Sequence, residues 1–240
     1  RNKKILGFAL SSVWQETEVG DNKAVIDTEA YSLLSYGSIK INESSHLDTL
    51  LGLGEMDIDF TRKVTGGENT GGRIGRQIYA SIAYSIKPNQ KWRDGESFFT
   101  KTLYSRLDLG YTFLKEYSEA GVASKTLRYN NLHVKNGSFS LGTTLNKNYT
   151  IKNGSLTPML RFEGGVSKTN NSLTEAYYNA KPSQLYTFSP SDELTAHTRV
   201  GLGIGAKLDN EWSYNMVYDR QDRTDSSFTN NLYFNIRKEF

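Results

Sequence analysis

The chain has 240 residues, a net charge of +3 and no cysteine. The lack of cysteine excludes disulfides and thiolate metal sites, and so small a net charge, with no Lys/Arg run, does not favour nucleic acid as a partner. No stretch approaches the roughly 20 apolar residues of a membrane helix. The mean hydropathy of −0.57 is ordinary for a soluble protein, but a transmembrane barrel would escape such an average because half of each strand faces a polar lumen.

Alternation of apolar and polar residues runs along almost the whole chain. The 15 tyrosines, 11 phenylalanines and 21 glycines, against only 4 prolines, suit strands better than helices. No signal peptide is present and Arg1 opens the chain, so the sequence is interpreted as a mature or excised fragment. Alternation with a period of two residues predicts ten strands, at 4–15, 31–41, 47–60, 77–86, 99–117, 136–149, 156–167, 194–208, 212–218 and 232–240.

The third of these segments changes its apolar face part-way along. Leu51 and Leu53 share one parity, whereas Met56 and Ile58 take the other. Such a switch indicates either a β-bulge or a strand that leaves the membrane zone. The glycine-rich segment that follows, 65–73, is predicted to be a polar link.

The segment 194–208 is the most informative of the ten. One parity reads Leu, Ala, Thr, Val, Leu, Ile, Ala and Leu, and the other holds His197, Arg199 and Gly201 within a series of small and basic residues. The solvent face of a sandwich strand would be polar, but it rarely carries so long a series of this kind. Because an arginine at the lipid midplane costs roughly 2–4 kcal/mol, segregation of charge onto one face has a physical cause in a membrane.

The connections between these segments alternate between tight and long. The links 151–156 and 208–212 are tight, whereas 117–132 and 168–193 are long. Short turns at one end and long loops at the other are typical of outer-membrane barrels, in which a closed ring satisfies every backbone N–H and C=O group. We therefore predict an all-β fold, a single antiparallel transmembrane β-barrel domain over residues 1–240. The alternative is a soluble β-sandwich or a secreted β-repeat.

Charged side chains collect on the face opposite the apolar one. Inside a barrel they would pair with one another and keep the passage hydrated. The pore-lining residues predicted on this basis are Arg106, Asp108, Glu116, Arg161, Glu163, His197, Arg199, Asp219, Arg237 and Glu239. Two lysines, Lys101 and Lys238, fall on the apolar parity, but both lie near strand ends, where a lysine can extend to the membrane interface.

Four stretches of the chain, taken together, carry a family resemblance. They are LLGLGEMDID (50–59) with Arg62, YSRLDLGYTFLKEYSEAG (104–121), GLGIGAKLDNEWSY (201–214) and the closing segment 232–240. In this order, and over essentially the whole chain, they resemble the β-domains of autotransporters. The resemblance implies a twelve-stranded barrel with an α-helix threaded through its pore, joined to an N-terminal secreted passenger.

Only about ten strands and no pore helix are visible in this sequence. Because the segment 4–15 resembles the third strand of the family, two strands, the helix and the passenger are expected upstream of Arg1. Some family members cleave their own pore helix with lumen carboxylates. Without a helix, that activity is carried over to no residue of this chain.

The last segment ends on an aromatic residue, as the closing strands of outer-membrane barrels commonly do. Leu232, Phe234, Ile236 and Phe240 share one parity and are predicted to form the signal that the barrel-assembly machinery recognises. Lys238 departs from the family, which often has an aromatic or aliphatic residue at that place.

An enzyme is the third class of protein to weigh, since some outer-membrane proteases and phospholipases are also barrels. They need Ser/His or His/Asp constellations. The three histidines here are His46 and His133, near strand ends, and His197, which is expected to point inward; no serine or carboxylate motif accompanies them. We therefore predict no enzymatic activity, no cofactor and no metal site.

The predicted function is that of an outer-membrane anchor and translocator domain, which assists the export of an N-terminal passenger to the cell surface (type V secretion). Its predicted partners are outer-membrane lipid, the barrel-assembly machinery and its own passenger, without nucleic acid. A monomer in the bacterial outer membrane is expected. The alternative is a small outer-membrane pore or an adhesin-like barrel that has no passenger.

Overall fold

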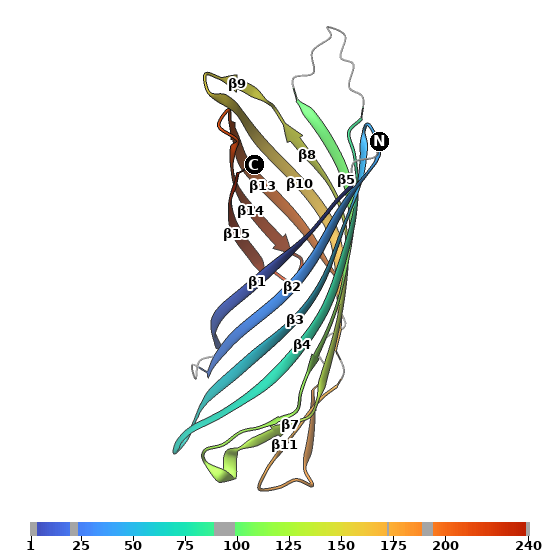
Figure 1. The fold of residues 1–240 in the computed structure, drawn as a ribbon. Helices are drawn as coiled ribbons and strands as arrows, with labels where there is room; N and C mark the ends of the chain where they lie inside the picture. The colour runs from blue at the N-terminus through green and yellow to red at the C-terminus, as the bar shows by residue number, and fades with distance from the viewer. Residues whose placement is uncertain (1–3, 20–23, 89–98, 172, 189–193, 239–240) are drawn as a thin grey trace.

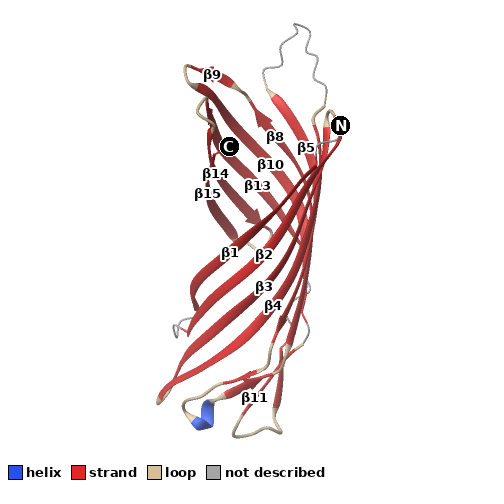
Figure 2. Cartoon of the chain, in the orientation of Figure 1, coloured by secondary structure: helices blue, strands red, loops and turns tan. Residues whose placement is uncertain are grey.

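The computed structural model describes residues 4–19, 24–88, 99–171, 173–188 and 194–238. In these residues ten long antiparallel strands and one short strand form a single curled sheet (Figures 1 and 2). The strands are β1 (Lys4–Val19), β2 (Ala24–Asn42), β3 (Ser45–Val64), β4 (Gly67–Ile86), β5 (Thr100–Leu114), β8 (Leu132–Asn146), β9 (Tyr149–Ile151), β10 (Gly154–Asn171), β13 (Leu194–Leu208), β14 (Trp212–Arg223) and β15 (Phe228–Lys238). They lie in the order β1-β2-β3-β4-β5-β8-β10-β13-β14-β15, with the short β9 beside β10.

Each of the ten predicted segments is a strand of this main sheet, so the prediction of an antiparallel all-β fold is confirmed. The segment 194–208 has the bounds of β13. Other strands extend beyond their predicted ends, as β2 does on both sides of 31–41. Alternation of apolar and polar residues identifies a strand because residues i and i+2 share a face. The pattern is lost toward strand ends at which neither face is apolar.

The prediction of a polar link at 65–73 is wrong. Only Thr65 and Gly66 form the turn, where Gly66 has a φ of 99°, and β4 already begins at Gly67. From there β4 pairs residue by residue with β3. Glycine-rich, polar composition is typical of loops, but here the hydrogen bonds to the long β3 keep the segment extended.

The change of apolar face within β3 is not a bulge. The pairing of β3 with β4 runs without a break from Ser45 to Val64. Past Leu53, the exposed outward positions are Glu55, Asp57 and Asp59. The first part of β3 therefore has an apolar outer face and the second part a charged one, which is expected of a strand that continues beyond the membrane.

Large apolar side chains lie on the outside of the sheet, with hardly any core. Among the described residues only Ala176 and Val217 are buried hydrophobics. By contrast, Leu141 is 57% exposed and Leu202 is 59% exposed, and both are mid-strand on the outward face. A continuous apolar band of this kind is unfavourable in water and suits a surface that faces lipid.

Two of the long connections fold into a second, smaller sheet. It consists of β6 (Tyr117–Ser118), β7 (Leu127–Tyr129), β11 (Thr174–Tyr178) and β12 (Leu185–Phe188), in the order β12-β11-β7-β6, with the 3-10 helix η1 (Ala123–Lys125) between β6 and β7. It lies at the end of the molecule that is lowest in Figure 1. Strands this short carry no periodic signal, so the sequence predicted only long loops. No helix in the described residues has the length and apolar character that a membrane crossing requires.

The strands β1 and β15 are the two edges of the main sheet. Within the described residues no hydrogen bonds join them, and the sheet is an open trough with the curvature of a barrel wall (Figure 1). The ten strands therefore do not close into a ring by themselves in this structure.

Candidate functional site

The inner face of the trough holds a buried carboxylate, that of Glu163 on β10, whose side chain has no exposed surface. Arg106 donates from Nη2 to Oε1 of Glu163 at 3.0 Å, and Nη1 of Arg199 lies 3.6 Å from the same oxygen. The hydroxyl of Tyr104 donates to Oε2 at 2.7 Å. Two guanidinium groups and a phenol thus surround one carboxylate and offset the cost of burying its charge.

Tyr104 reaches Glu163 across an intervening strand. In the sheet register, Tyr104 of β5 lies opposite Gly142 of β8, and Gly142 lies opposite Glu163. A side chain at Gly142 would collide with the ring of Tyr104. The glycine therefore leaves the space through which the tyrosine bonds to a strand that is not its neighbour.

A second pair repeats this arrangement further along the sheet. Arg161 of β10, Gly201 of β13 and Asp219 of β14 lie in one register row. Nη1 of Arg161 donates to Oδ2 of Asp219 at 3.3 Å, and the Asp219 side chain is 3% exposed. A side chain at Gly201 would meet the Asp219 carboxylate, so glycine is again what lets the pair form. Together the two pairs connect five adjacent strands on the inner face.

Beside Glu163 the inner face is hollowed into a polar pocket of about 230 Å³. Arg106 donates from Nε to Asp108 at 3.0 Å, and Arg199 donates to Gln221 at 2.7 Å. The hydroxyl of Ser138 also donates to Asp108, at 3.1 Å. The pocket carries charges of both signs, and those of Arg106, Asp108 and Arg199 are already paired or hydrogen-bonded, so we interpret it as a hydrated wall and not as a dedicated anion or cation site. In the described part of the chain no group of three His, Asp or Glu side chains could hold a metal ion.

His197 has partners that its sequence context did not reveal. Its Nε2 lies 3.3 Å from the hydroxyl oxygen of Ser140 and 3.9 Å from Oε1 of Glu163. Both groups approach the same ring nitrogen, while the buried Nδ1 has no hydrogen-bond partner in the described residues. In a hydrolase relay the serine and the carboxylate bond to opposite nitrogens of the histidine. The Ser140–His197–Glu163 arrangement therefore differs from such a relay.

The structure brings seven of the ten predicted pore-lining residues together on this inner face: Arg106, Asp108, Arg161, Glu163, His197, Arg199 and Asp219. Glu116 lies apart, in the connection after β5, where its exposed carboxylate is 3.3 Å from Arg128. Arg237 also faces inward, because it lies opposite Ser213 on the edge strand β15, but it is exposed and lies apart from these seven residues. Glu239 is outside the described residues, as is Phe240 of the predicted assembly signal. That the seven line a pore stays a prediction.

The Glu163 cluster, formed by Glu163 and the polar side chains around it on the inner face, also has neutral members, which the sequence analysis did not predict. Parity alone places Tyr104 on the same face as Arg106. Tyr104 was left out because only ionisable Arg, Asp, Glu and His residues were chosen as pore-lining. Ser140 and Gln221, both buried on this face, were missed for the same reason. Strand parity, applied to every polar residue, would have found Tyr104 and Ser140, whereas Gln221 lies beyond residue 218, where the predicted strand ended, and within the longer β14.

A second buried cluster joins the small sheet to the long hairpin of β3 and β4. Glu119 follows β6, and its side chain is 4% exposed. Arg62 of β3 holds it with two hydrogen bonds, of 3.1 and 2.6 Å, and the backbone N–H of Leu127 donates to it at 2.9 Å. Asn69 of β4 donates to the same carboxylate at 3.2 Å. Arg62 and Asn69 lie 57 and 50 positions from Glu119 in the chain, so no local pattern could predict these contacts.

Aromatic rings complete this contact. Phe60 of β3 stacks on Tyr117 at 5.0 Å, and Tyr117 stacks on Tyr129 at 4.8 Å, as measured between ring centroids. The guanidinium of Arg73 lies 5.3 Å from the Tyr117 centroid. Burial raises the pKa of Tyr117 and of Tyr129 above the ordinary value, so both phenols stay neutral and the stack is not disturbed by charge near neutral pH.

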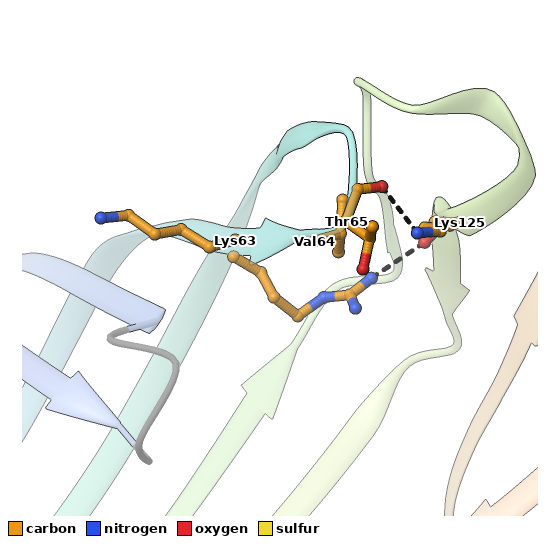
Figure 3. A pocket seen from close by; sticks show the side chains of 5 residues that line it. Lys63, Val64, Thr65 and Lys125 are labelled. Carbon is orange, nitrogen blue, oxygen red and sulfur yellow. Dashed lines mark hydrogen bonds between the residues drawn. The ribbon is translucent and has the colours of Figure 1, made fainter.

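The tip of the β3–β4 hairpin forms an open pocket of about 490 Å³ with η1 (Figure 3). It is basic, and two of its three cations, Arg62 and Lys125, are engaged. Nζ of Lys125 donates to the carbonyl of Thr65 at 2.6 Å, and Arg62 donates to the carbonyl of Lys125 at 2.9 Å (Figure 3). These bonds fasten the 115–131 connection to the hairpin.

The Glu119→Gln substitution tests whether this cluster holds the connection in place. The glutamine would leave Arg62 without its counter-charge, and we expect a local destabilisation of about 2 kcal/mol. Trypsin cleavage after Lys125 and Arg128 should become correspondingly faster. The matched control is Glu68→Gln, at an exposed position on the same hairpin, which should leave cleavage unchanged. Equal cleavage rates in the two variants would contradict a structural role for Glu119.

A family model described as "Autotransporter beta-domain" matches residues 1–219 of this chain. The match spans the main sheet from β1 into β14 and includes the Glu163 cluster. No curated protein matches the chain.

Two solved structures are similar to the chain. The translocator domain of the autotransporter NalP from Neisseria meningitidis has a TM-score of 0.69 at 13% identity, with 99% of this chain and 82% of that chain covered. The transport unit of the autotransporter AIDA-I from Escherichia coli has a TM-score of 0.59 at 10% identity, with 95% and 71% covered. At such identities the likeness concerns the fold.

Proposed function

The chain belongs to the autotransporter β-domain family, and from that premise we propose that its charged inner face lines the passage used by an N-terminal passenger of the same polypeptide. The domain is an outer-membrane translocator and anchor of a Gram-negative bacterium. The observation that carries the proposal is the division of its sheet into an exposed apolar outer face and an inner face of paired charges.

The paired charges suit a passage for unfolded chain. Because Glu163 is already neutralised by Arg106 and Arg199, the wall exposes no strong single-sign field that would trap a charged segment in transit. The pocket beside the cluster is polar and keeps that part of the wall wet. We assign to these residues a structural and lining role.

The orientation in the membrane follows from the connections. The end with the small second sheet has the long connections 115–131 and 172–193, next to tight turns at 65–66 and 224–227. At the other end the links at 43–44 and 209–211 are tight, and the link from Ile86 to Thr100 is a longer exception. Long loops are extracellular in outer-membrane barrels. At the end opposite the small second sheet, Nζ of Lys238 lies 5.4 Å from the centroid of the Trp212 ring and Nζ of Lys147 lies 5.1 Å from the centroid of the Tyr149 ring. Such pairs suit the aromatic belt of a membrane interface.

We propose that residues 1–240 belong to one barrel domain and that further strands and a pore helix complete it. Within the described residues the edges β1 and β15 are unpaired, which supports this proposal because unpaired N–H and C=O groups are costly within lipid. A monomer surrounded by lipid would then need no partner to cover its apolar band.

The closing strand is proposed to guide assembly. Leu232, Phe234 and Ile236 lie on the outward face of β15 and are 68%, 65% and 51% exposed. Three large apolar side chains in a row on a free edge offer an extended apolar strand to the barrel-assembly machinery, which would bind it by strand addition.

We propose that this domain is not an enzyme. The support is the geometry of His197, in which Ser140 and Glu163 both approach Nε2. The histidine is then a buried member of the Glu163 cluster.

Surface display of the passenger tests the proposed function. In cells that express the full-length protein, external protease should release the passenger. The Phe234→Ala/Ile236→Ala variant should display several-fold less passenger, because less barrel is assembled, and His197→Ala should display the normal amount.

The matched control for the terminal strand is Tyr233→Ala, since Tyr233 is 55% exposed on the opposite face of β15. Normal display by the Phe234→Ala/Ile236→Ala variant would exclude the assembly signal. A protein whose upstream region never reaches the surface would instead favour a pore without a passenger.

A further inference from the structure

We propose that two outward-facing lysines, Lys135 of β8 and Lys168 of β10, bind the phosphate of a lipid headgroup in the outer leaflet. The inference rests on the proposed function only for its orientation, in which the small second sheet marks the extracellular end. It concerns the lipid-facing surface, on the opposite side of the sheet from the Glu163 cluster.

Both lysines lie at the extracellular margin of the apolar band. On β10, Lys168 shares the outward parity of Phe162 and Val166 and comes directly after them. On β8, Lys135 shares the parity of Phe139 and Leu141 and precedes them. Both lysines are exposed. Their ammonium groups therefore extend to the depth at which acyl chains give way to polar headgroups.

The two lysines are diagonal neighbours on adjacent strands. In the register, Lys168 lies opposite Gly137 and Lys135 lies opposite Asn170, so their Cα atoms are separated by about 7–8 Å. In the described part of the chain neither lysine has an ion pair or a hydrogen bond from its side chain. Two cations at this spacing repel each other, and a phosphate between them would replace that repulsion with two charge-assisted hydrogen bonds.

Two outward arginines near this margin differ, because each has an acidic partner. Arg76 on β4, next to the outward-facing Ile78, pairs with Glu55 at 3.1 Å. Arg220 on β14, next to the outward-facing Tyr218, pairs with Asp222 at 2.8 Å, and its guanidinium lies 5.1 Å from the Phe228 ring. Unlike these two arginines, the Lys135–Lys168 pair has no acidic partner within the described residues, so its positive charge is not balanced.

The surroundings of the lysines suit a headgroup. Tyr111 lies opposite Lys135, and its hydroxyl is 2.7 Å from Nδ1 of His133, which fixes the ring at the interface, where aromatic residues favour the headgroup level. The exposed amide of Asn170 adds a neutral donor beside Lys135. A phosphomonoester, with three acceptor oxygens, would satisfy this set better than a phosphodiester. The headgroup chemistry inferred is therefore an anionic phosphomonoester.

Native mass spectrometry of the full-length protein, folded in detergent and titrated with phosphatidic acid, tests the inference. Since a lysine near a charged lipid surface changes affinity about five-fold, the Lys135→Gln/Lys168→Gln variant should bind phosphatidic acid about 30-fold more weakly. The matched control, Arg76→Gln/Arg220→Gln, removes the same two charges from paired sites and should change binding less than about two-fold. The Lys135→Arg/Lys168→Arg variant should keep wild-type binding.

Several outcomes would overturn the inference. Equal losses in the two glutamine variants would indicate general attraction to anionic lipid, and an unchanged Lys135→Gln/Lys168→Gln variant would remove the site. Displacement of the lipid by millimolar inorganic phosphate would indicate a site for the free anion. Heat-modifiable gel mobility and passenger display report the proposed function separately: if both are normal while lipid selectivity is absent, only this inference fails.

Discussion

Replacing Glu163 with glutamine is expected to lower the free energy of unfolding by about 3 kcal/mol. The amide has nearly the same shape and can still accept a hydrogen bond from Tyr104, but it cannot balance Arg106 and Arg199. Both guanidinium groups are mostly shielded by the inner face, with 27% and 21% of their side chains exposed. Denaturant unfolding of the protein in lipid vesicles, followed by tryptophan fluorescence, would measure the change.

The same substitution at an exposed ion pair is the matched control. Glu116 pairs with Arg128 in solvent, and the two side chains are 53% and 43% exposed, so Glu116→Gln should cost less than about 1 kcal/mol. Tyr104→Phe, which removes one hydrogen bond and no charge, should cost about 1 kcal/mol. A loss for Glu163→Gln no larger than that for Glu116→Gln would show that the cluster is solvated and does not stabilise the wall.

Replacing Leu202 with arginine is expected to prevent stable insertion or to destabilise the folded barrel by about 2–4 kcal/mol. Leu202 lies in the middle of β13, opposite Leu160 on one side and Tyr218 on the other. In water, a leucine that is 59% exposed could become arginine at little cost. In lipid the same change places a cation near the midplane. Heat-modifiable gel mobility and denaturant midpoints in vesicles would both report it.

Leu185 offers the control for this substitution. It is 51% exposed, but it lies on β12 of the small second sheet, outside the apolar band. Leu185→Arg should therefore leave insertion and stability close to those of the unmodified protein. If the two arginine variants behaved alike, the outward face of β13 would not be a lipid-facing surface.

Much of the main sheet could be predicted because its information is local. Alternation over a few residues is enough to find a strand and to assign its faces, as the match between 194–208 and β13 illustrates. The start of β4 could not be found in this way. Residues 67–72 look like a loop by composition and are a strand only because β3 extends far enough to pair with them.

The candidate site was predictable in its charged residues but not in its neutral residues or its contacts. Parity and charge placed Glu163, Arg106 and Arg199 on one face. The bond from Tyr104 to Glu163 depends on the order of three strands and on Gly142 between them. The Arg62–Glu119 pair depends on the folding of a connection back onto a hairpin. Both contacts join residues more than 50 positions apart, at a separation where pattern within a strand carries no information.

The sequence by itself determined the strands, their outer and inner faces, and so the membrane class of the fold, because these follow from a two-residue period and from the cost of charge in lipid. The tertiary structure alone decided which polar side chains meet. It also decided that two long connections form a sheet. Within the described residues, it further decided that the edges β1 and β15 are unpaired and that Lys135 and Lys168 are neighbours with no acidic partner. The reason is that register between strands, which sets these neighbours, is a property of the pairing and not of either strand alone.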